Sequence, residues 1–235
     1  MKAMTFNIQH GKDFLKGNID LKKVADAIKA EGGEVVCLNE VYGKGPHPHF
    51  TAQAKEIAEY LGYEWHFAPA IKIMGAGPYG NAFLSKYPII KAETVPVPTV
   101  PRTHEGYYED RCAFCAVVDV EGRYLTVVGC HFGLQPEEQV ECVKTVCDLI
   151  DASVYPVVLM GDFNVTPEDK VLEPIRQRLK DSAEMAGGNE ATFPSDKPDI
   201  KIDYLFYSPE ITLEEVTIPK KIVSDHLPIV AQIRF

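Results

Sequence analysis

The sequence of 235 residues lacks the features of a membrane protein and of an array of small domains. No apolar run approaches the roughly 18 residues that a membrane-spanning helix needs. The N-terminus has no apolar signal-peptide core, and no repeat, low-complexity segment or linker divides the chain. We therefore expect one cytoplasmic domain over residues 1–235, without a membrane anchor.

Positive charge is scarce relative to negative charge. The chain has 24 lysines and arginines against 34 aspartates and glutamates, a net charge of −10, and no cluster of five or more basic residues. This balance disfavours a protein that grips duplex DNA by broad counterion release. Nucleic acid is thus a possible partner but not a favoured one, and the sequence shows no motif for a protein partner.

A disulfide framework is not expected, although the chain has six cysteines. Such frameworks belong to small secreted domains, and this chain is neither small nor evidently secreted. Cys112 and Cys115 have the CxxC spacing, but no second pair accompanies them. Residues three apart in a strand point to opposite faces, so these two would not ligate one metal ion. We expect reduced and mostly buried thiols.

The hydrophobic pattern predicts an α/β domain. Helices are predicted over residues 20–31, 50–61 and 136–152, and a short helix near Pro167. Strands are predicted over residues 2–8, 35–39, 80–85, 89–97, 112–120, 123–132, 156–161, 201–207, 211–218 and 228–235. Several neighbouring strands have hairpin-length connections, which indicates mixed sheets with helices outside rather than one parallel sheet.

Polar residues of metal-binding or proton-transferring types recur at the ends of these apolar strands. Charged groups there are costly to bury unpaired, so they usually converge on a metal, a partner or water. Each alone could be an ordinary turn or cap residue, but the whole set predicts a site. The set consists of Asn7, Glu40, His131, Asp162, Asn164, Asp203, Asp225 and His226.

Seven short motifs carry a resemblance to a known family. They are TFNI at 5–8, LNEV at 38–41, GNAFLSKYPI at 80–89, GCHF at 129–132, GDFN at 161–164, IDYLF at 202–206 and SDHLPI at 224–229. In this order the chain resembles the endonuclease/exonuclease/phosphatase superfamily, also called DNase-I-like, over nearly its whole length. The resemblance implies a four-layer αββα sandwich of two facing mixed sheets, with the active site at one edge.

The resemblance also implies a metal site. Glu40 matches the family's principal ligand, a hard carboxylate oxygen suited to Mg²⁺, for which Mn²⁺ is a possible substitute. Asn7 matches the amide that supports this metal directly or through water. Asp225 matches an acid near the metal, sometimes proposed as a ligand, whose role is the least defined of the set.

Five further residues match the catalytic groups of the family. Asp162 would orient and deprotonate the attacking water, and Asn164 would hold phosphate or water. His226 would stabilise the transition state through a phosphoryl oxygen, and Asp203 would orient His226 and favour its protonated form. His131 matches a second histidine donor to the phosphate.

Two residues are candidates for substrate binding. Arg111 stands where many relatives place an arginine near the phosphate, and a guanidinium there can bind phosphate with two hydrogen bonds. An ion pair with Glu109 or Asp110 is an equally good interpretation. Asn81, in the GNAFLSKYPI motif, is assigned to the substrate as well.

Two loops carry weaker signals. The segment 96–110 is rich in proline and aromatic residues and would either border the site or form a plain surface loop. In the first case Arg102, His104, Tyr107 or Tyr108 would contact the leaving group. His47 and His49 resemble a metal pair, but prolines intervene and Mg²⁺ prefers oxygen ligands.

The implied function is Mg²⁺-dependent hydrolysis of a phosphoester, as a phosphatase or phosphodiesterase, by in-line attack of water on phosphorus. The family uses this machinery on DNA, RNA, inositol phosphates, sphingomyelin and protein–nucleic-acid linkages, so the motifs do not select a substrate. The short chain and its negative charge favour a small or exposed phosphoester. A DNA or RNA nuclease is the alternative, and a non-catalytic phosphate-binding module, without Mg²⁺-dependent turnover, is the third.

Overall fold

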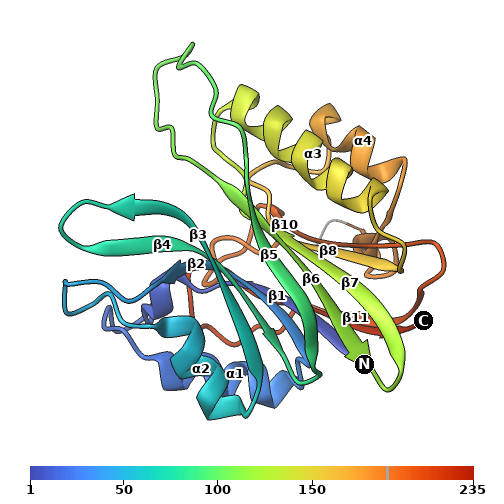
Figure 1. Ribbon diagram of the computed structural model, residues 1–235, viewed down its shortest axis with the longest axis horizontal. Coiled ribbons are helices and arrows are strands. Elements are labelled where there is room, and N and C mark those ends of the chain that lie inside the picture. Colours follow the sequence, from blue (N-terminus) through green and yellow to red (C-terminus); the bar gives the residue numbers. More distant parts are fainter. Residues whose placement is uncertain (189–190) are drawn as a thin grey trace.

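Two mixed β-sheets face each other at the centre of the molecule, and helices cover their outer faces (Figure 1). The structure is a computed structural model that describes residues 1–188 and 191–235. The first six-stranded sheet has the order β11 (Thr212–Thr217), β12 (Ile229–Arg234), β1 (Lys2–Asn7), β2 (Val35–Tyr42), β4 (Gly77–Ser85) and β3 (Glu64–Ile73). The second has the order β5 (Ile89–Pro96), β6 (Cys112–Val120), β7 (Arg123–Cys130), β8 (Val157–Asp162), β10 (Asp203–Tyr207) and β9 (Lys180–Asp181).

Helices α1 (Leu21–Glu31) and α2 (Gln53–Leu61) pack on the first sheet, and α3 (Pro136–Asp151) and α4 (Glu173–Arg176) on the second (Figure 1). Short 3₁₀ turns lie at Gln9–Gly11, Lys170–Leu172 and Ser182–Glu184. Each sheet contains a parallel pair, β1–β2 and β7–β8, and antiparallel pairs. This is the four-layer αββα sandwich that the sequence predicts.

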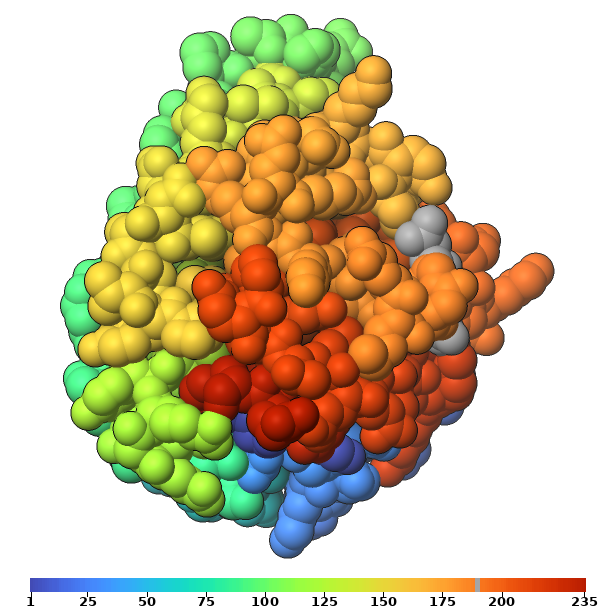
Figure 2. Space-filling view, turned by 90° about the vertical axis from the view of Figure 1, so that its right-hand side faces the viewer, coloured from blue at the N-terminus to red at the C-terminus, as the bar shows by residue number. Residues whose placement is uncertain are grey.

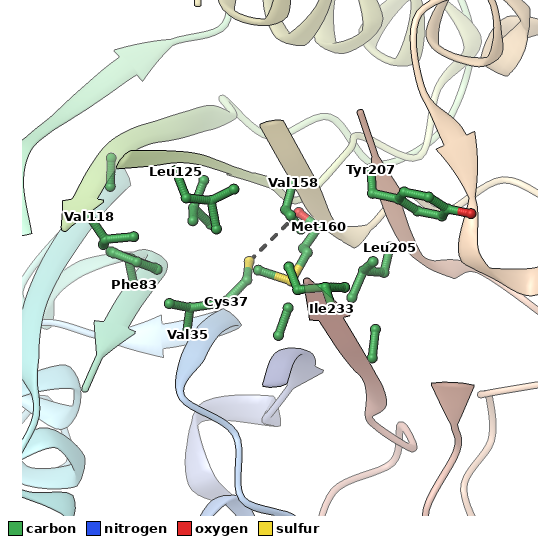
Figure 3. Packing of buried hydrophobic residues seen from close by; sticks show 14 of the residues in the cluster. Val35, Cys37, Phe83, Val118, Leu125, Val158, Met160, Leu205, Tyr207 and Ile233 are labelled. Carbon is green, nitrogen blue, oxygen red and sulfur yellow. Dashed lines mark hydrogen bonds between the residues drawn. The ribbon is translucent and has the colours of Figure 1, made fainter. Parts of the chain in front are cut away.

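The central strands are apolar on both faces because each face is covered. In β2, Val35 and Cys37 point into the core between the sheets, and Val36 and Leu38 point toward α1 and α2. This is the two-residue alternation of a strand with both faces buried. Figure 3 shows the core between the sheets, where Cys37 from the first sheet meets Met160 from the second.

Local signals set the ends of the longer helices. Asp20 accepts a hydrogen bond from the Lys23 amide at the start of α1, and Gly32 ends this helix in the left-handed conformation. At the start of α3, Gln135 and Glu138 form a capping box in front of an apolar face. These helices therefore begin and end close to their predicted limits.

The sequence prediction missed β3, the first part of β4 and the short strand β9. Strand β3 lies at the edge of its sheet and is largely exposed, so its apolar alternation is weak. It also contains Pro69 beside a register shift, and a proline argues against a strand unless that strand is an edge. The helix predicted from residue 50 begins at Gln53, and the one expected near Pro167 is a 3₁₀ turn followed by α4.

All six cysteines are free thiols, as expected, and five of them are buried. Cys112 belongs to the core between the sheets, but Cys115 packs against the cluster under α3. The two therefore face opposite sides of β6, as their spacing in a strand predicts.

The two ends of the sequence meet in the first sheet. Strand β12 pairs with β1, and the space-filling view shows the C-terminal residues in red beside the N-terminal residues in blue (Figure 2). No helix within residues 1–188 and 191–235 combines the length and apolarity needed to cross a bilayer.

Gly161 lies where β8 passes close to the end of β7. A Cβ atom at this position would lie 1.9 Å from the Cys130 carbonyl oxygen, and φ is +151°. Gly122 offers a matched control, because its φ is +85° but nothing lies within 4 Å of its Cβ position.

Replacement of Gly161 by Ala should lower the free energy of unfolding by at least about 3 kcal/mol, since backbone must shift against backbone. Gly122→Ala should cost only about 1–2 kcal/mol, the strain of a left-handed residue. Denaturant unfolding of both variants measures the difference. Equal losses would show that the close approach of β7 and β8 does not constrain residue 161.

Candidate active site

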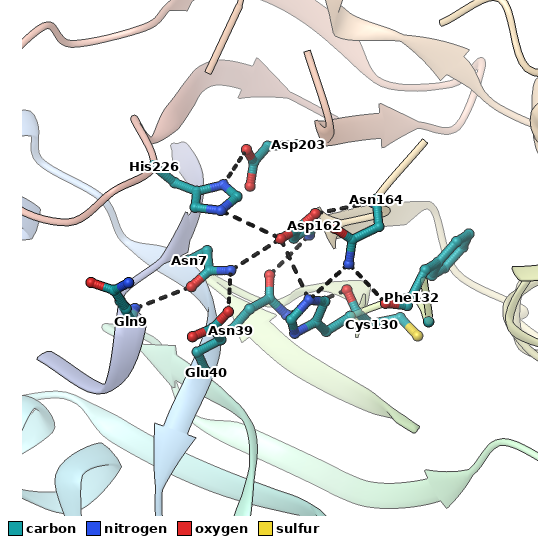
Figure 4. A network of polar contacts seen from close by, with 12 residues as sticks. Asn7, Gln9, Asn39, Glu40, Cys130, Phe132, Asp162, Asn164, Asp203 and His226 are labelled. Atoms are coloured by element: carbon teal, nitrogen blue, oxygen red, sulfur yellow. Dashed lines mark hydrogen bonds and ion pairs between the residues drawn. The ribbon is translucent and has the colours of Figure 1, made fainter. Parts of the chain in front are cut away.

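The strand-end polar residues meet at one edge of the sandwich (Figure 4). In the first sheet Asn7 ends β1, and its register partner in the parallel strand β2 is Asn39, which precedes Glu40. In the second sheet Asp162 ends β8 and is paired with Asp203, the first residue of β10. The paired strand ends of each sheet, Asn7 with Asn39 and Asp162 with Asp203, thus bring these polar side chains together.

Asp162 is a buried carboxylate that joins the two sheets. Its Oδ2 accepts from Asn7 Nδ2 at 3.0 Å, its Oδ1 accepts from the Asn164 amide at 3.0 Å, and its own amide donates to Asn39 Oδ1 at 2.9 Å. Burial raises the pKa of Asp162 to about 7, with a further increase from the Asp203 charge. The positive charge of His226 and the two donated hydrogen bonds act in the opposite direction.

His226 lies between two carboxylates. Its Nδ1 donates to Asp203 Oδ2 at 2.9 Å, and its Nε2 lies 3.7 Å from Asp162 Oδ2. Burial of the ring lowers the pKa of His226, but the Asp203 and Asp162 charges outweigh burial and raise it to about 10. His226 is therefore an imidazolium at neutral pH, with its Nε2–H directed toward Asp162.

His131 is a neutral imidazole. Burial lowers its pKa well below the ordinary value, and the positive charges of Arg111 and His226 lower it further. Its Nε2 accepts from Asn164 Nδ2 at 3.1 Å and lies 3.5 Å from Asp162 Oδ2. The same side-chain Nδ2 of Asn164 also donates to the Phe132 backbone carbonyl at 3.0 Å. The proton of His131 consequently resides on Nδ1.

Two of these residues have left-handed backbone conformations. Glu40 has φ +59° and Asn164 has φ +52°. Asparagine tolerates this region, but for glutamate it is uncommon, and such strain concentrates at functional sites. The β2–β4 pairing also shifts register between Leu38 and Val41, so a bulge redirects the Glu40 side chain toward Asn7.

The oxygen-rich side of the site fits a hard divalent cation. Glu40 Oε1 accepts from Asn7 Nδ2 at 3.1 Å, and Gln9 Nε2 donates to Asp225 Oδ2 at 2.8 Å. Gln9 Oε1 is buried without a hydrogen-bond partner in the described part of the chain. Carboxylates and amide oxygens are the donors that Mg²⁺ prefers, and an orphaned amide oxygen among acids is best satisfied by a cation or its water.

A second set of residues also has the spacing of a metal site. One ligand atom from each of Asp162, Asp203 and His226 lies within 4.8 Å of the others. His226 Nδ1 is already committed to Asp203, and the charged ring supplies the positive charge between the two acids. A cation at this position would have to replace the charged ring between the two acids.

Asn81 lies in the amide network behind the site. Its Oδ1 accepts from Asn39 Nδ2 at 2.8 Å, and its Nδ2 donates to the Cys112 carbonyl at 2.9 Å. Both polar groups of this buried amide are used within the protein, so Asn81 holds Asn39 in place. This differs from the substrate contact expected from its motif.

Three residues near the site were not singled out by sequence reasoning. Asn39 holds the Asp162 amide, Gln9 holds Asp225, and Tyr79 lies beside Glu40, to which it is hydrogen-bonded. Burial and the Glu40 charge raise the pKa of Tyr79. Asn39 had a signal, since it directly precedes Glu40 in an otherwise apolar strand. Gln9 and Tyr79 had none, because their contacts depend on a 3₁₀ turn and on the missed part of β4.

The remaining candidates lie outside the central network. Arg111 is only 8% exposed and its Nη1 lies 2.9 Å from Glu109 Oε1, which is the ion pair considered from the sequence. Its charge nevertheless acts on His131, so Arg111 borders the site. His47 and His49 are exposed, with ring centroids 5.2 Å apart, and neither joins the network around Asp162 in the described structure.

Comparisons with known proteins agree with the geometry. The uncharacterized protein YbhP of Escherichia coli (strain K12) is 25% identical over 248 aligned positions, covering 99% of this chain and 95% of YbhP. The endonuclease/exonuclease/phosphatase from Beutenbergia cavernae DSM 12333 has a TM-score of 0.81 at 24% identity, covering 100% of this chain and 71% of its own. The mannosyl-6-phosphatase Bt3783 from Bacteroides thetaiotaomicron VPI-5482 has a TM-score of 0.79 at 17% identity, covering 100% of both chains.

The family match extends over nearly the whole sequence. A model of the Endonuclease/Exonuclease/phosphatase family aligns with residues 4–226, a range that includes Asn7, Glu40, Asp162, Asp203 and His226. The chain therefore belongs to the endonuclease/exonuclease/phosphatase family, whose members hydrolyse phosphoester bonds.

Proposed function

We propose that this protein hydrolyses a small or exposed phosphoester in a divalent-metal-dependent reaction, by in-line attack of water on phosphorus. One observation carries the proposal: the buried Asp162 carboxylate faces the His226 imidazolium at 3.7 Å, and Asn7 Nδ2 donates to both Asp162 and Glu40. This arrangement supports a general base, Asp162, and a cationic hydrogen-bond donor, His226, next to Glu40 as an oxygen ligand for a metal ion.

Asp162 is the proposed general base. Its pKa of about 7 lies near the operating pH, where a base both is deprotonated and accepts a proton readily. Hydrogen bonds from Asn7 and Asn164 fix the orientation of its two oxygens. A water molecule beside this carboxylate would be oriented toward the phosphorus and lose its proton to Asp162.

His226 is the proposed donor to the phosphoryl oxygen. Asp203 holds its ring through Nδ1 and keeps the ring protonated, so Nε2–H is available to the negative charge that develops in the transition state. Asn164 and the neutral His131 are hydrogen-bonded to each other, and we place both at the phosphate. The guanidinium of Arg111 is the proposed contact on the substrate side.

Glu40 and Asn7, with Asp225 nearby, would hold Mg²⁺, or Mn²⁺ in its place, which supplies Lewis-acid polarisation of a phosphoryl oxygen. The net charge of −10 supports a small substrate over duplex DNA. A shared fold with a mannosyl-6-phosphatase is consistent with a phosphomonoester, although 17% identity shows the fold alone.

His226→Ala should lower kcat by at least about 100-fold, because a preorganised donor to the transition state is lost. The assay is Mg²⁺-dependent hydrolysis of phosphomonoesters, a simple phosphodiester, inositol phosphates, and single-stranded and duplex DNA. His49→Ala, at an exposed histidine, is the control and should retain wild-type activity. Equal activity of the two variants would remove His226 from the mechanism, and cleavage of DNA alone would make the protein a nuclease.

Glu40→Gln should shift the Mg²⁺ concentration for half-maximal activity upward by at least about tenfold, since a charged oxygen ligand becomes a neutral amide of the same shape. The measurement is an activity titration with Mg²⁺. Glu59→Gln, on the exposed face of α2, should leave the titration unchanged. An unchanged midpoint in Glu40→Gln would place the metal elsewhere.

Asp203→Asn should return the pKa of His226 from about 10 toward its ordinary value near 6.5, because the carboxylate that stabilises the charged ring is removed. A raised pKa contributes stability that is fully present below pH 6.5 and is lost as pH rises through about 10. The variant should therefore be less stable than the wild type at neutral pH. Its free energy of unfolding should also fall less than that of the wild type as the pH rises from 6.5 to about 10.

NMR titration of the His226 ring in metal-free protein, together with unfolding at several pH values, measures both effects. Asp225→Asn is the matched control. The Asp225 charge raises the pKa of His226 less than the Asp203 charge does, so this variant should lower the pKa less than Asp203→Asn. A larger fall in Asp225→Asn than in Asp203→Asn would contradict the assigned pairing.

A further inference from the structure

A cavity of about 250 Å³ lies under the loop of residues 97–111, which connects β5 to β6. In Figure 1 this loop, in green, rises beside the first turn of α3. Loop residues form most of the lining, and Ile71 of β3 and Glu138 of α3 complete it. We call it the loop cavity.

The loop cavity adjoins the active site through two of its lining residues. Arg111 directly precedes β6, in which Ala113 pairs with Cys130, the residue before His131. Ile71 of β3 is the register partner of Tyr79 in β4, and Tyr79 is hydrogen-bonded to Glu40. A phosphoester held between His226 and Glu40 would therefore have this space beside it, on the side of His131 and Tyr79.

Most polar groups in the lining are already paired within the protein. Glu109 binds Arg111 and the Tyr107 hydroxyl, and Glu138 accepts from the backbone amides of Glu109 and Gln135. Arg111 Nε is an exception: it is buried and has no hydrogen-bond partner in residues 1–188 and 191–235. An unpaired buried donor is costly, and an oxygen atom of a ligand would satisfy it.

The rest of the lining decides what kind of group fits. Two arginines stand against three carboxylates, so the net negative charge disfavours a second phosphate and hence a polynucleotide. Asp110 and Thr99 at the exposed rim offer acceptors to hydroxyl groups. Val97, Pro98 and the tyrosine rings offer apolar faces. The volume is below the roughly 300–1,000 Å³ of sites for drug-sized ligands.

We infer that the loop cavity is the leaving-group pocket of the proposed phosphoesterase and takes an uncharged, hydroxyl-bearing ring of monosaccharide size. Apolar faces pack against the C–H faces of such a ring, and Arg111 Nε and the rim acceptors bind its oxygens. The inference rests on the proposed function and adds the class of substrate.

The loop is held in place before a ligand enters. Glu137, in the first turn of α3, accepts from Tyr108 Oη at 2.5 Å and from Thr103 Oγ1 at 2.5 Å, and lies 3.1 Å from His104 Nδ1. At the base of the loop the Val97 amide donates to the Arg111 carbonyl at 2.9 Å. A preformed pocket costs little ordering on binding, so these contacts should affect KM rather than kcat.

The test compares a hexose 6-phosphate with methyl phosphate, both primary alkyl phosphomonoesters, so that only the ring differs. Wild-type protein with Mg²⁺ should favour the hexose 6-phosphate by at least about tenfold in kcat/KM. Val100→Trp, at a lining position, fills the cavity and should remove this preference while leaving methyl phosphate turnover unchanged. Glu105→Trp, at an exposed loop position outside the lining, is the control and should keep the preference.

Glu137→Ala gives a second measurement, since it releases the loop without adding bulk to the cavity. It should raise KM for the hexose 6-phosphate at least about tenfold with little change in kcat. Equal kcat/KM of wild type on the two esters, or a preference for a dinucleotide, would overturn the inference while leaving a working phosphoesterase. Absence of Mg²⁺-dependent turnover of every phosphoester would instead overturn the proposed function.

Discussion

The burial of the Asp162 carboxylate between two sheets is the constraint on which the site depends. A buried charge is tolerated only when hydrogen bonds and an opposite charge compensate it. Asn7 donates to the carboxylate from the first sheet, and Asn39 of the same sheet accepts from the Asp162 backbone amide. His226 supplies the opposite charge from the loop before β12. The contacts that compensate this carboxylate are therefore complete only when both halves of the sandwich are assembled.

The same constraint reaches into the backbone. Asp162 comes directly after Gly161, where β8 approaches β7 too closely for a side chain. The parallel pairing of β1 with β2 places Asn7 beside Asn39, and the left-handed Glu40 then turns its side chain back toward Asn7. Local irregularities in the strands, at Gly161 and Glu40, thus orient the polar side chains. The closely packed apolar core between the sheets holds these irregularities in place.

Much of this arrangement could be predicted from the sequence, because polar residues interrupting apolar strands are unusual. Asp162, Asp203 and His226 were identified by position and motif, and the structure brings them together. The supporting contacts were less accessible. Tyr79 lies in a part of β4 without a strand signal, and the pairing of Gln9 with Asp225 spans most of the sequence. Tertiary contacts of this kind leave no local periodicity to recognise.

Arg111 shows how the two sequence interpretations of one residue can be physically compatible. Its ion pair with Glu109 fixes the guanidinium, while its buried Nε has no hydrogen-bond partner in the described residues and the side chain lines the loop cavity. The pairing also offsets the charge of Arg111, which limits the attraction of extended polyanions. In the proposed mechanism the chemistry would be built on rigid strand ends, whereas selection of the leaving group would fall to a loop that can change in sequence without disturbing them.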